Sequence, residues 1–249
     1  MNKRRRAIAR SVDRALGTLG HSRGRYALAA ASTEVGAACN ALRLRGIVAR
    51  AAVFTSTSPG VDISRLAIEQ DVDLVLVAYG GQLDDPEVTA LLLRAPCDVA
   101  VAVGPEATAG TVLVPFGGSE HDWSAIELGA WLAASWQVTL RLAGPAAEGG
   151  RDASRLLASA SLAVQRALGI AAEPLLVEPG PQQLVAAADG AAIVIIGLSE
   201  RWRTEGLGSA RAALAASGRP VLLVRKGLRP GGIAPPQNLT RFTWSLGTA

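Results

Sequence analysis

The segment Thr111–Ala134, TVLVPFGGSEHDWSAIELGAWLAA, sets the architecture expected of this 249-residue chain. Its first part, Thr111–Phe116, is an apolar run without polar alternation, which is typical of a strand covered on both faces. After two glycines, Ser119 and Asp122 fit a capping box, and apolar residues then recur at helical spacing. The segment therefore predicts a strand, a tight turn and a helix in direct succession.

The same alternation of short apolar runs and helical patterns continues on both sides of this segment. It predicts helices over Ala27–Leu44 and after Asp152, the latter on a clear apolar stripe. The order of elements is typical of an α/β fold, flavodoxin-like or Rossmann-like, with parallel sheets. The predicted strands are Val48–Thr55, Asp73–Ala78, Val99–Val103, Thr111–Phe116, Val138–Leu142, Glu173–Val177, Ala192–Gly197 and Val221–Arg225.

Two stretches of the chain repeat each other. Pro59-Gly60 and Pro179-Gly180 each open a helical run that leads into a strand, with a proline expected at the first helical position. We interpret the pattern as two copies of one unit in tandem, joined by Gly104–Gly110. The predicted parts are a basic N-terminal tail over 1–26, an incomplete unit over 27–104, a complete unit over 111–226 and a C-terminal tail over 227–249.

The first copy is the shorter one. It has three predicted strands against five, because the sequence before Val48 contains only helix-like patterns. Missing strands leave sheet edges unpaired unless another segment covers them. A start inside a longer ancestral sequence would account for the difference.

Composition limits the classes of protein to consider. Hydrophobic residues make up 49% and charged residues 18%, which excludes a disordered chain. The apolar runs are shorter than a membrane span requires. The net charge of +4 comes from arginines concentrated near the start, without interleaved aromatic residues, which favours a solvated terminus over a nucleic-acid site. Cys39 and Cys97 show no metal-ligand spacing and no secretory signal precedes them, so we expect a cytoplasmic protein.

Three segments carry a resemblance to a known family. Val112–Ser119, Ile193–Gly197 with Gly206–Ser209, and Arg219–Arg225 resemble the corresponding parts of universal stress proteins (UspA). The resemblance implies parallel sheets with helices on both faces, and pairing through the last strand in dimers or tandem pseudo-dimers. The expected partner is therefore a second copy of the chain, or its own other unit, through sheet edges.

The resemblance also implies a candidate nucleotide site, with ATP or AMP as the possible cofactor. Nucleotide-binding members of the family have an acidic residue at the end of the first strand and a glycine motif after the fourth. Here Pro115 and Phe116 stand at the acidic position, and Glu200 replaces the second glycine of the motif. The candidate binding residues are Pro115, Phe116, Gly117, Gly118, Ser119, Gly197, Leu198, Gly208 and Ser209. Gly197, Gly208 and Ser209 are equally consistent with a strand end and a helix start, whereas Gly117 and Gly118 favour a tight turn that needs small residues.

The sequence is also consistent with two other functions, a transporter's regulatory region and weak ATP hydrolysis. The incomplete unit, the complete unit and the tail Gly231–Leu246 together resemble the cytosolic C-terminal region of bacterial cation:proton antiporters, which implies a membrane transporter domain as a possible partner. Weak ATP hydrolysis is a further alternative, with Glu200 and Asp122 as its candidate bases. Ser119, His121 and Asp122 are neighbours on one predicted helix and cannot line up as a catalytic triad by themselves.

Other motifs carry less weight. Gly206-Leu207-Gly208 lacks the third glycine of a dinucleotide fingerprint, because Arg211 occupies that position. Two histidines and two cysteines are too scattered to predict a metal site. The favoured hypothesis is a non-enzymatic regulatory module that is cytoplasmic, and a transporter partner would hold it at a membrane.

Overall fold

The computed structural model describes residues 7–11, 25–78, 83, 85–146, 153–228 and 233, of which 7–11, 25–27 and 78 are described as backbone only. Its strands are β1 (Ala7–Ser11), β2 (Leu74–Ala78), β3 (Asp98–Val103), β4 (Thr111–Pro115), β5 (Leu140–Pro145), β6 (Ala172–Val177), β7 (Ala191–Gly197) and β8 (Val221–Arg225). Its helices are α2 (Arg25–Leu44), α3 (Pro59–Glu69), α4 (Pro86–Arg94), α5 (Glu120–Trp136), α6 (Ser154–Leu168), α7 (Pro181–Ala187), α8 (Trp202–Glu205) and α9 (Ser209–Ala215).

The described strands form one eight-stranded sheet in the order β1-β2-β3-β8-β7-β4-β5-β6. Neighbouring strands are parallel except for β3 and β8, which pair antiparallel with Val101 opposite Leu223. This arrangement confirms the predicted α/β fold with mostly parallel strands. It also shows how the last strands of the two sequence halves, β3 and β8, meet in the middle of the sheet.

Glycines stand at both ends of the β3–β8 ladder. Gly104 has a positive φ of 82°, and a Cβ there would lie 2.4 Å from the carbonyl oxygen of Arg219. A Cβ on Gly227 would lie 2.3 Å from the carbonyl carbon of Cys97. These distances are shorter than any normal contact of a Cβ atom. A larger residue at either position would push the backbones apart, so the two glycines allow the segments to approach this closely.

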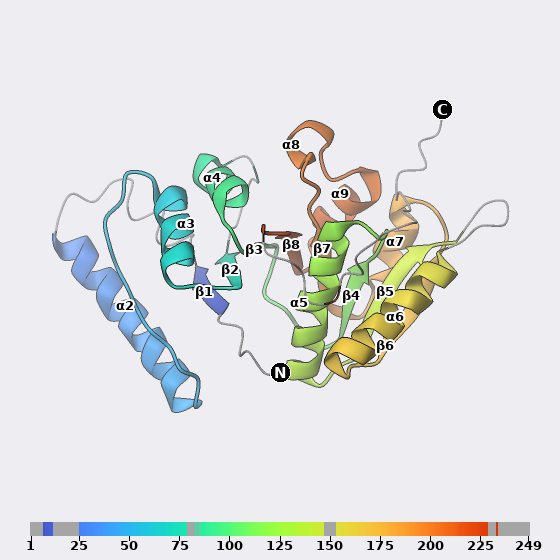
Figure 1. Ribbon diagram of the computed structural model, residues 1–249, viewed down its shortest axis with the longest axis horizontal. Helices are drawn as coiled ribbons and strands as arrows, with labels where there is room; N and C mark the ends of the chain where they lie inside the picture. Colours follow the sequence, from blue (N-terminus) through green and yellow to red (C-terminus); the bar gives the residue numbers. More distant parts are fainter. Residues whose placement is uncertain are drawn as a thin grey trace.

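Helices cover the sheet on both faces (Figure 1). One core cluster gathers apolar side chains from α3, α4, α7, α8 and α9, and the other gathers those of α5 and α6. The apolar stripe predicted after Asp152 is confirmed, since Leu157, Ala160 and Val164 of α6 are buried. Most strand residues are buried on both faces, which explains why the strand sequences lack alternation.

Two predictions about the first half are wrong. Val48–Thr55, expected as a strand, has no strand pairing, and Val48 is 91% exposed. The start of the chain, expected to contain only a helix-like tail, contributes β1, which pairs with β2. In the second half the helix proline is Pro181 rather than Pro179, because α7 begins two residues later than expected. The other predicted strands are confirmed, with ends that shift by a few residues.

Helix α2, predicted from Ala27 to Leu44, is present but lies outside the two layers. It contributes no residue to either core cluster of the described chain, and Figure 1 shows it at the outer end of the molecule, beyond α3. The predicted tail after residue 226 lies mostly outside the described residues. Within it, Ile233 is buried with the α5 and α6 cluster.

Candidate functional site

The candidate site lies at the carboxyl ends of β4 and β7, where parallel sheets of this kind bind ligands. β4 ends at Pro115, and the chain turns through Phe116, Gly117 and Gly118 into α5. Gly118 has a positive φ of 88°, which makes the tight turn possible. The ring of Phe116 packs edge-to-face on Trp123, with 4.9 Å between ring centroids. The turn is therefore held on the core, and its side chains are buried.

Ser119 is the N-cap of α5, as the capping box predicts. The backbone N–H of Asp122 donates to Ser119 Oγ at 3.2 Å, and the backbone N–H of Ser119 donates to Asp122 Oδ2 at 3.1 Å. Oδ2 also accepts the N–H of Gly117 at 3.0 Å. One carboxylate oxygen thus takes two of the backbone donors of this turn.

The other oxygen of Asp122 pairs with an arginine from the far end of the chain. Arg211 Nη2 on α9 donates to Asp122 Oδ1 at 2.7 Å, and Arg211 Nη1 donates to the carbonyl oxygen of Gly197 at 3.2 Å. Asp122 is fully buried and Arg211 is 15% exposed. This buried ion pair ties α5, β7 and α9 together at the candidate site.

Gly197, at the end of β7, lies close to the start of α5. A Cβ at this position would lie 2.6 Å from the carbonyl carbon of His121 and 2.7 Å from both the backbone nitrogen and Oδ1 of Asp122. Only glycine fits without moving the start of α5. The glycine therefore has a packing reason that is independent of any ligand.

The nine predicted binding residues divide into two groups. Pro115 to Ser119 lie on the turn that Asp122 caps, where Gly117 and Ser119 bond its carboxylate, and Gly197 packs beside it. Leu198 belongs to neither group, because its side chain is fully buried in the core. Gly208, with a positive φ of 73°, and Ser209 are exposed at the start of α9, less than one turn before Arg211. They lie at the same end of the sheet as the first group.

Sequence reasoning missed the Asp122–Arg211 pair. The sequence indicates Asp122 as a helix-capping residue and a candidate base, and Arg211 only as the residue that breaks a glycine fingerprint. The positions are 89 residues apart, so no local pattern connects them. One signal could have indicated the pair. Arg211 follows Gly208 by three residues, and the predicted fold places both it and Asp122 at the carboxyl end of the sheet.

His121 lies next to this pair but makes a different contact. Its Nδ1 accepts the backbone N–H of Lys226 at 3.2 Å, just after β8. Burial lowers the pKa of His121 below its ordinary value of 6.5, although Glu200, Asp122 and Glu120 oppose the shift; Arg225 adds to it. Neutral His121 is therefore a connection between α5 and the end of β8, reinforced by the Lys226 Nζ–Glu120 ion pair at 2.8 Å.

The described residues offer little for a metal ion. Within those ranges, His, Cys, Asp and Glu side chains form no group of three that could hold one. Cys39 and Cys97 are both buried, and neither forms a disulfide. Of the helices that the structure describes, none has the length and apolar character to cross a membrane.

Comparison with solved structures shows which proteins share the fold. A universal stress protein from Archaeoglobus fulgidus superposes with a TM-score of 0.56 at 18% identity, covering 79% of this chain and 76% of its own. A putative universal stress protein from Pseudomonas aeruginosa gives 0.51 at 17% identity, covering 88% of this chain and 91% of its own. A functionally unknown protein from Pseudomonas aeruginosa gives 0.51 at 18% identity, covering 83% and 80%.

Comparisons of sequence gave no match, either with protein-family models or with curated proteins. At 17–18% identity the structural likeness concerns the fold alone. The chain therefore has the α/β fold of universal stress proteins, with Asp122 and Arg211 paired at the corner where its sequence resembles a nucleotide site.

Proposed function

We propose that this chain is a non-enzymatic regulatory module with the universal-stress-protein fold, and that it acts by binding a partner rather than by turning over a substrate. The observation that carries the proposal is the bonding of Asp122. Its carboxylate already takes the N–H groups of Gly117 and Ser119 and the charge of Arg211. A phosphate at this turn would have to displace a buried carboxylate from all three donors.

The contacts of the polar residues also support a non-catalytic role. In an activated nucleophile, the base binds the hydroxyl and a third group orients the base. Here Ser119 Oγ accepts a backbone N–H of the helix cap, and His121 Nδ1 accepts a backbone N–H from Lys226. The Asp122 carboxylate binds the turn and Arg211. Each group is therefore used either in capping α5 or in joining it to its neighbours.

Calorimetry with ATP, ADP, AMP and cyclic AMP, in the presence of magnesium and at physiological salt, tests the proposal. We expect no saturable heat from the wild-type chain. A hydrolysis assay with ATP is expected to show no turnover above background. Turnover that disappears in Glu200→Ala would contradict the non-enzymatic assignment and support the weak hydrolase instead.

A second candidate function is the binding of an adenine nucleotide at the loop before α9. It is favoured by the exposure of Gly208 and Ser209, with Arg201 and Arg203 exposed nearby in sequence. Saturable binding that is lost in Gly208→Val would support it. Gly218→Val is the matched control, because Gly218 is also exposed, has a φ of 72° and has open space around its Cβ position. If both variants lose binding equally, the loss reflects backbone strain.

A further inference from the structure

The segment Leu42–Arg50, which we call the α2 tip, is the most exposed apolar part of the first half. It comprises the last turn of α2 and the loop after it, at the lower end of this helix in Figure 1. Leu44 is 90% exposed and Val48 is 91% exposed, while Leu42 and Ile47 are exposed to a lesser degree. Exposed aliphatic side chains gathered within one short segment are a feature of surfaces that meet another molecule.

Arginines alternate with these aliphatic residues. Arg43, Arg45 and Arg50 are exposed, and the sequence has no acidic residue between Glu34 and Asp62. The α2 tip thus carries a charge of +3 without a nearby negative charge in sequence. Its chemistry is apolar and cationic at once.

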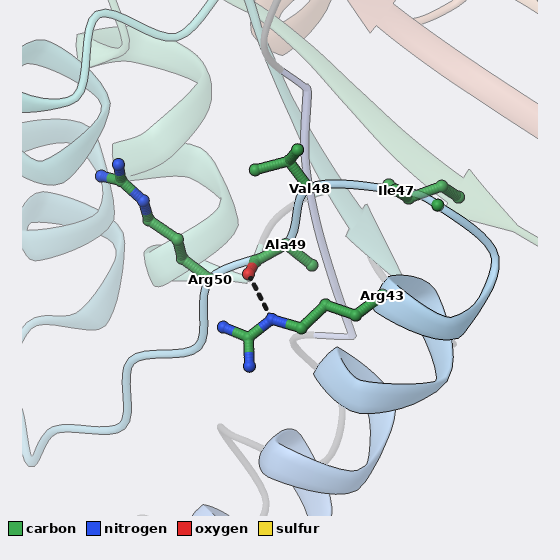
Figure 2. Close-up of a pocket in the computed structure, with 6 residues that line it drawn as sticks. Arg43, Ile47, Val48, Ala49 and Arg50 are labelled. Carbon is green, nitrogen blue, oxygen red and sulfur yellow. Dashed lines mark hydrogen bonds between the residues drawn. The ribbon is translucent and has the colours of Figure 1, made fainter.

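The loop folds back on the end of the helix and forms an open cavity of about 410 Å³. Arg43 Nε donates to the carbonyl oxygen of Ala49 at 3.2 Å, which holds the loop in place. Figure 2 shows Ile47 and Val48 on this loop above the bond, with Arg50 following in the chain. Guanidinium groups and aliphatic side chains therefore line one hollow surface.

We propose that the α2 tip docks on an anionic membrane surface. Guanidinium groups bind lipid phosphates through charge-assisted hydrogen bonds, while Leu44 and Val48 enter the apolar layer beneath the headgroups. Basic residues next to exposed aliphatic ones are the combination that anionic lipid attracts. This inference is independent of the proposed function, because it uses no residue of the Asp122 site.

Other occupants fit the tip less well. A second copy meeting tip to tip would bring together six positive charges with no acidic residue of either tip to balance them. Single-stranded nucleic acid is bound through aromatic stacking platforms, and Leu42–Arg50 contains no aromatic residue. A lipid surface supplies both the negative charge and the apolar layer.

The test is flotation of the full chain with vesicles of phosphatidylcholine alone or mixed with phosphatidylglycerol. We expect binding only to the anionic vesicles, and weaker binding when the salt concentration is raised. Two variants separate the contributions: Arg43→Gln/Arg45→Gln/Arg50→Gln removes the charge, and Leu44→Ser/Val48→Ser removes the apolar side chains. Each is expected to lower the partition coefficient by roughly tenfold or more.

Matched controls make the changes elsewhere on the surface. Arg155→Gln/Arg166→Gln removes two exposed arginines of α6, and Leu228→Ser replaces a leucine that is 81% exposed. Both should bind vesicles as the wild type does. Equal binding to neutral vesicles, no binding at all, or equal losses in the controls would overturn the proposal. Concentration-dependent self-association that Leu44→Ser/Val48→Ser removes, without vesicle binding, would assign the tip to a second copy instead.

Discussion

Asp122 has more partners than any other side chain at the candidate site, and its value to the fold is measurable. Its carboxylate accepts hydrogen bonds from Gly117, Ser119 and Arg211, and it is fully buried. Removing it leaves two backbone N–H groups without this acceptor, and leaves the mostly buried Arg211 with the Gly197 carbonyl but no opposite charge. We expect Asp122→Ala to lower the free energy of unfolding by about 3–5 kcal/mol, measured by chemical denaturation.

The same measurement has an internal comparison. Arg201 and Glu205 form an ion pair at 2.9 Å on the surface, with side chains 75% and 50% exposed. Because water screens this pair, Glu205→Ala is expected to cost less than about 1 kcal/mol. In the double variant Asp122→Ala/Arg211→Ala, removal of the arginine should return part of the lost stability, because no buried charge is left alone. A loss below about 1 kcal/mol for Asp122→Ala would show that the corner does not depend on this carboxylate.

His121 predicts how stability changes with pH. Burial lowers its pKa below 6.5 in the folded chain, so the unfolded chain binds the proton more readily. The contribution of neutral His121 is complete above pH 6.5 and is lost as the pH falls from there toward the folded-state pKa. Protonation would also remove Nδ1 as acceptor for Lys226.

The variant His121→Asn keeps an acceptor near the Nδ1 position but does not titrate. We expect the melting temperature of the wild type to fall more steeply than that of the variant between about pH 6.5 and pH 5. Both proteins should have similar slopes above pH 7, where His121 is neutral. Identical slopes over the acidic range would show that another group controls the acid sensitivity.

Among the helices and strands, those built on long local patterns could be predicted from the sequence. The capping box at Ser119 and the apolar stripe of α6 state where a helix begins and which face it buries, and both are confirmed. The apolar runs of β4 and β7 could likewise be predicted as buried strands, because strands covered on both faces have few polar residues. These signals are contained within one element.

Elements that depend on a distant partner could not be predicted in this way. Val48–Thr55 has the composition of a strand, but a strand also needs a neighbour to supply hydrogen bonds, and no strand among the described residues pairs with it. β1 has a partner in β2, yet its arginine-rich surroundings resemble a solvated tail. Charged residues are common at sheet edges, where they protect the unpaired side, so composition alone is ambiguous there.

In the candidate site, too, only the part that depends on neighbouring residues could be predicted. The turn from Gly117 to Ser119 could be located from the sequence because strand, glycines and helix cap are consecutive. The ion pair that fills it could not, since Arg211 reaches Asp122 only after β7 and α9 have been placed in the sheet. Sequence therefore indicates where such a site lies and leaves open whether its donors face a ligand or another part of the chain.

For the molecule as a whole, the antiparallel pairing of β3 with β8 is the feature that joins the two halves. It makes the sheet continuous, and one core cluster contains Val77 and Val101 from the first half together with Ile196 and Leu223 from the second. On the face of the sheet that this cluster covers, the two halves therefore share one hydrophobic core. We therefore expect the chain to unfold as one cooperative unit.

Two probes with different locations test this cooperativity. Four of the five tryptophans, at 123, 131, 136 and 202, lie in the second half, and Trp244→Phe removes the fifth, which lies outside the described residues. Fluorescence of that variant reports on the second half, whereas far-ultraviolet circular dichroism also reports on α3 and α4. Coincident midpoints in urea are expected, and Val101→Asp, which places a charge in the shared core opposite Leu223, should lower both midpoints together. Loss of helical signal before any change in fluorescence would mean that the first half unfolds separately, and that β3–β8 pairing contributes little to the stability of the second.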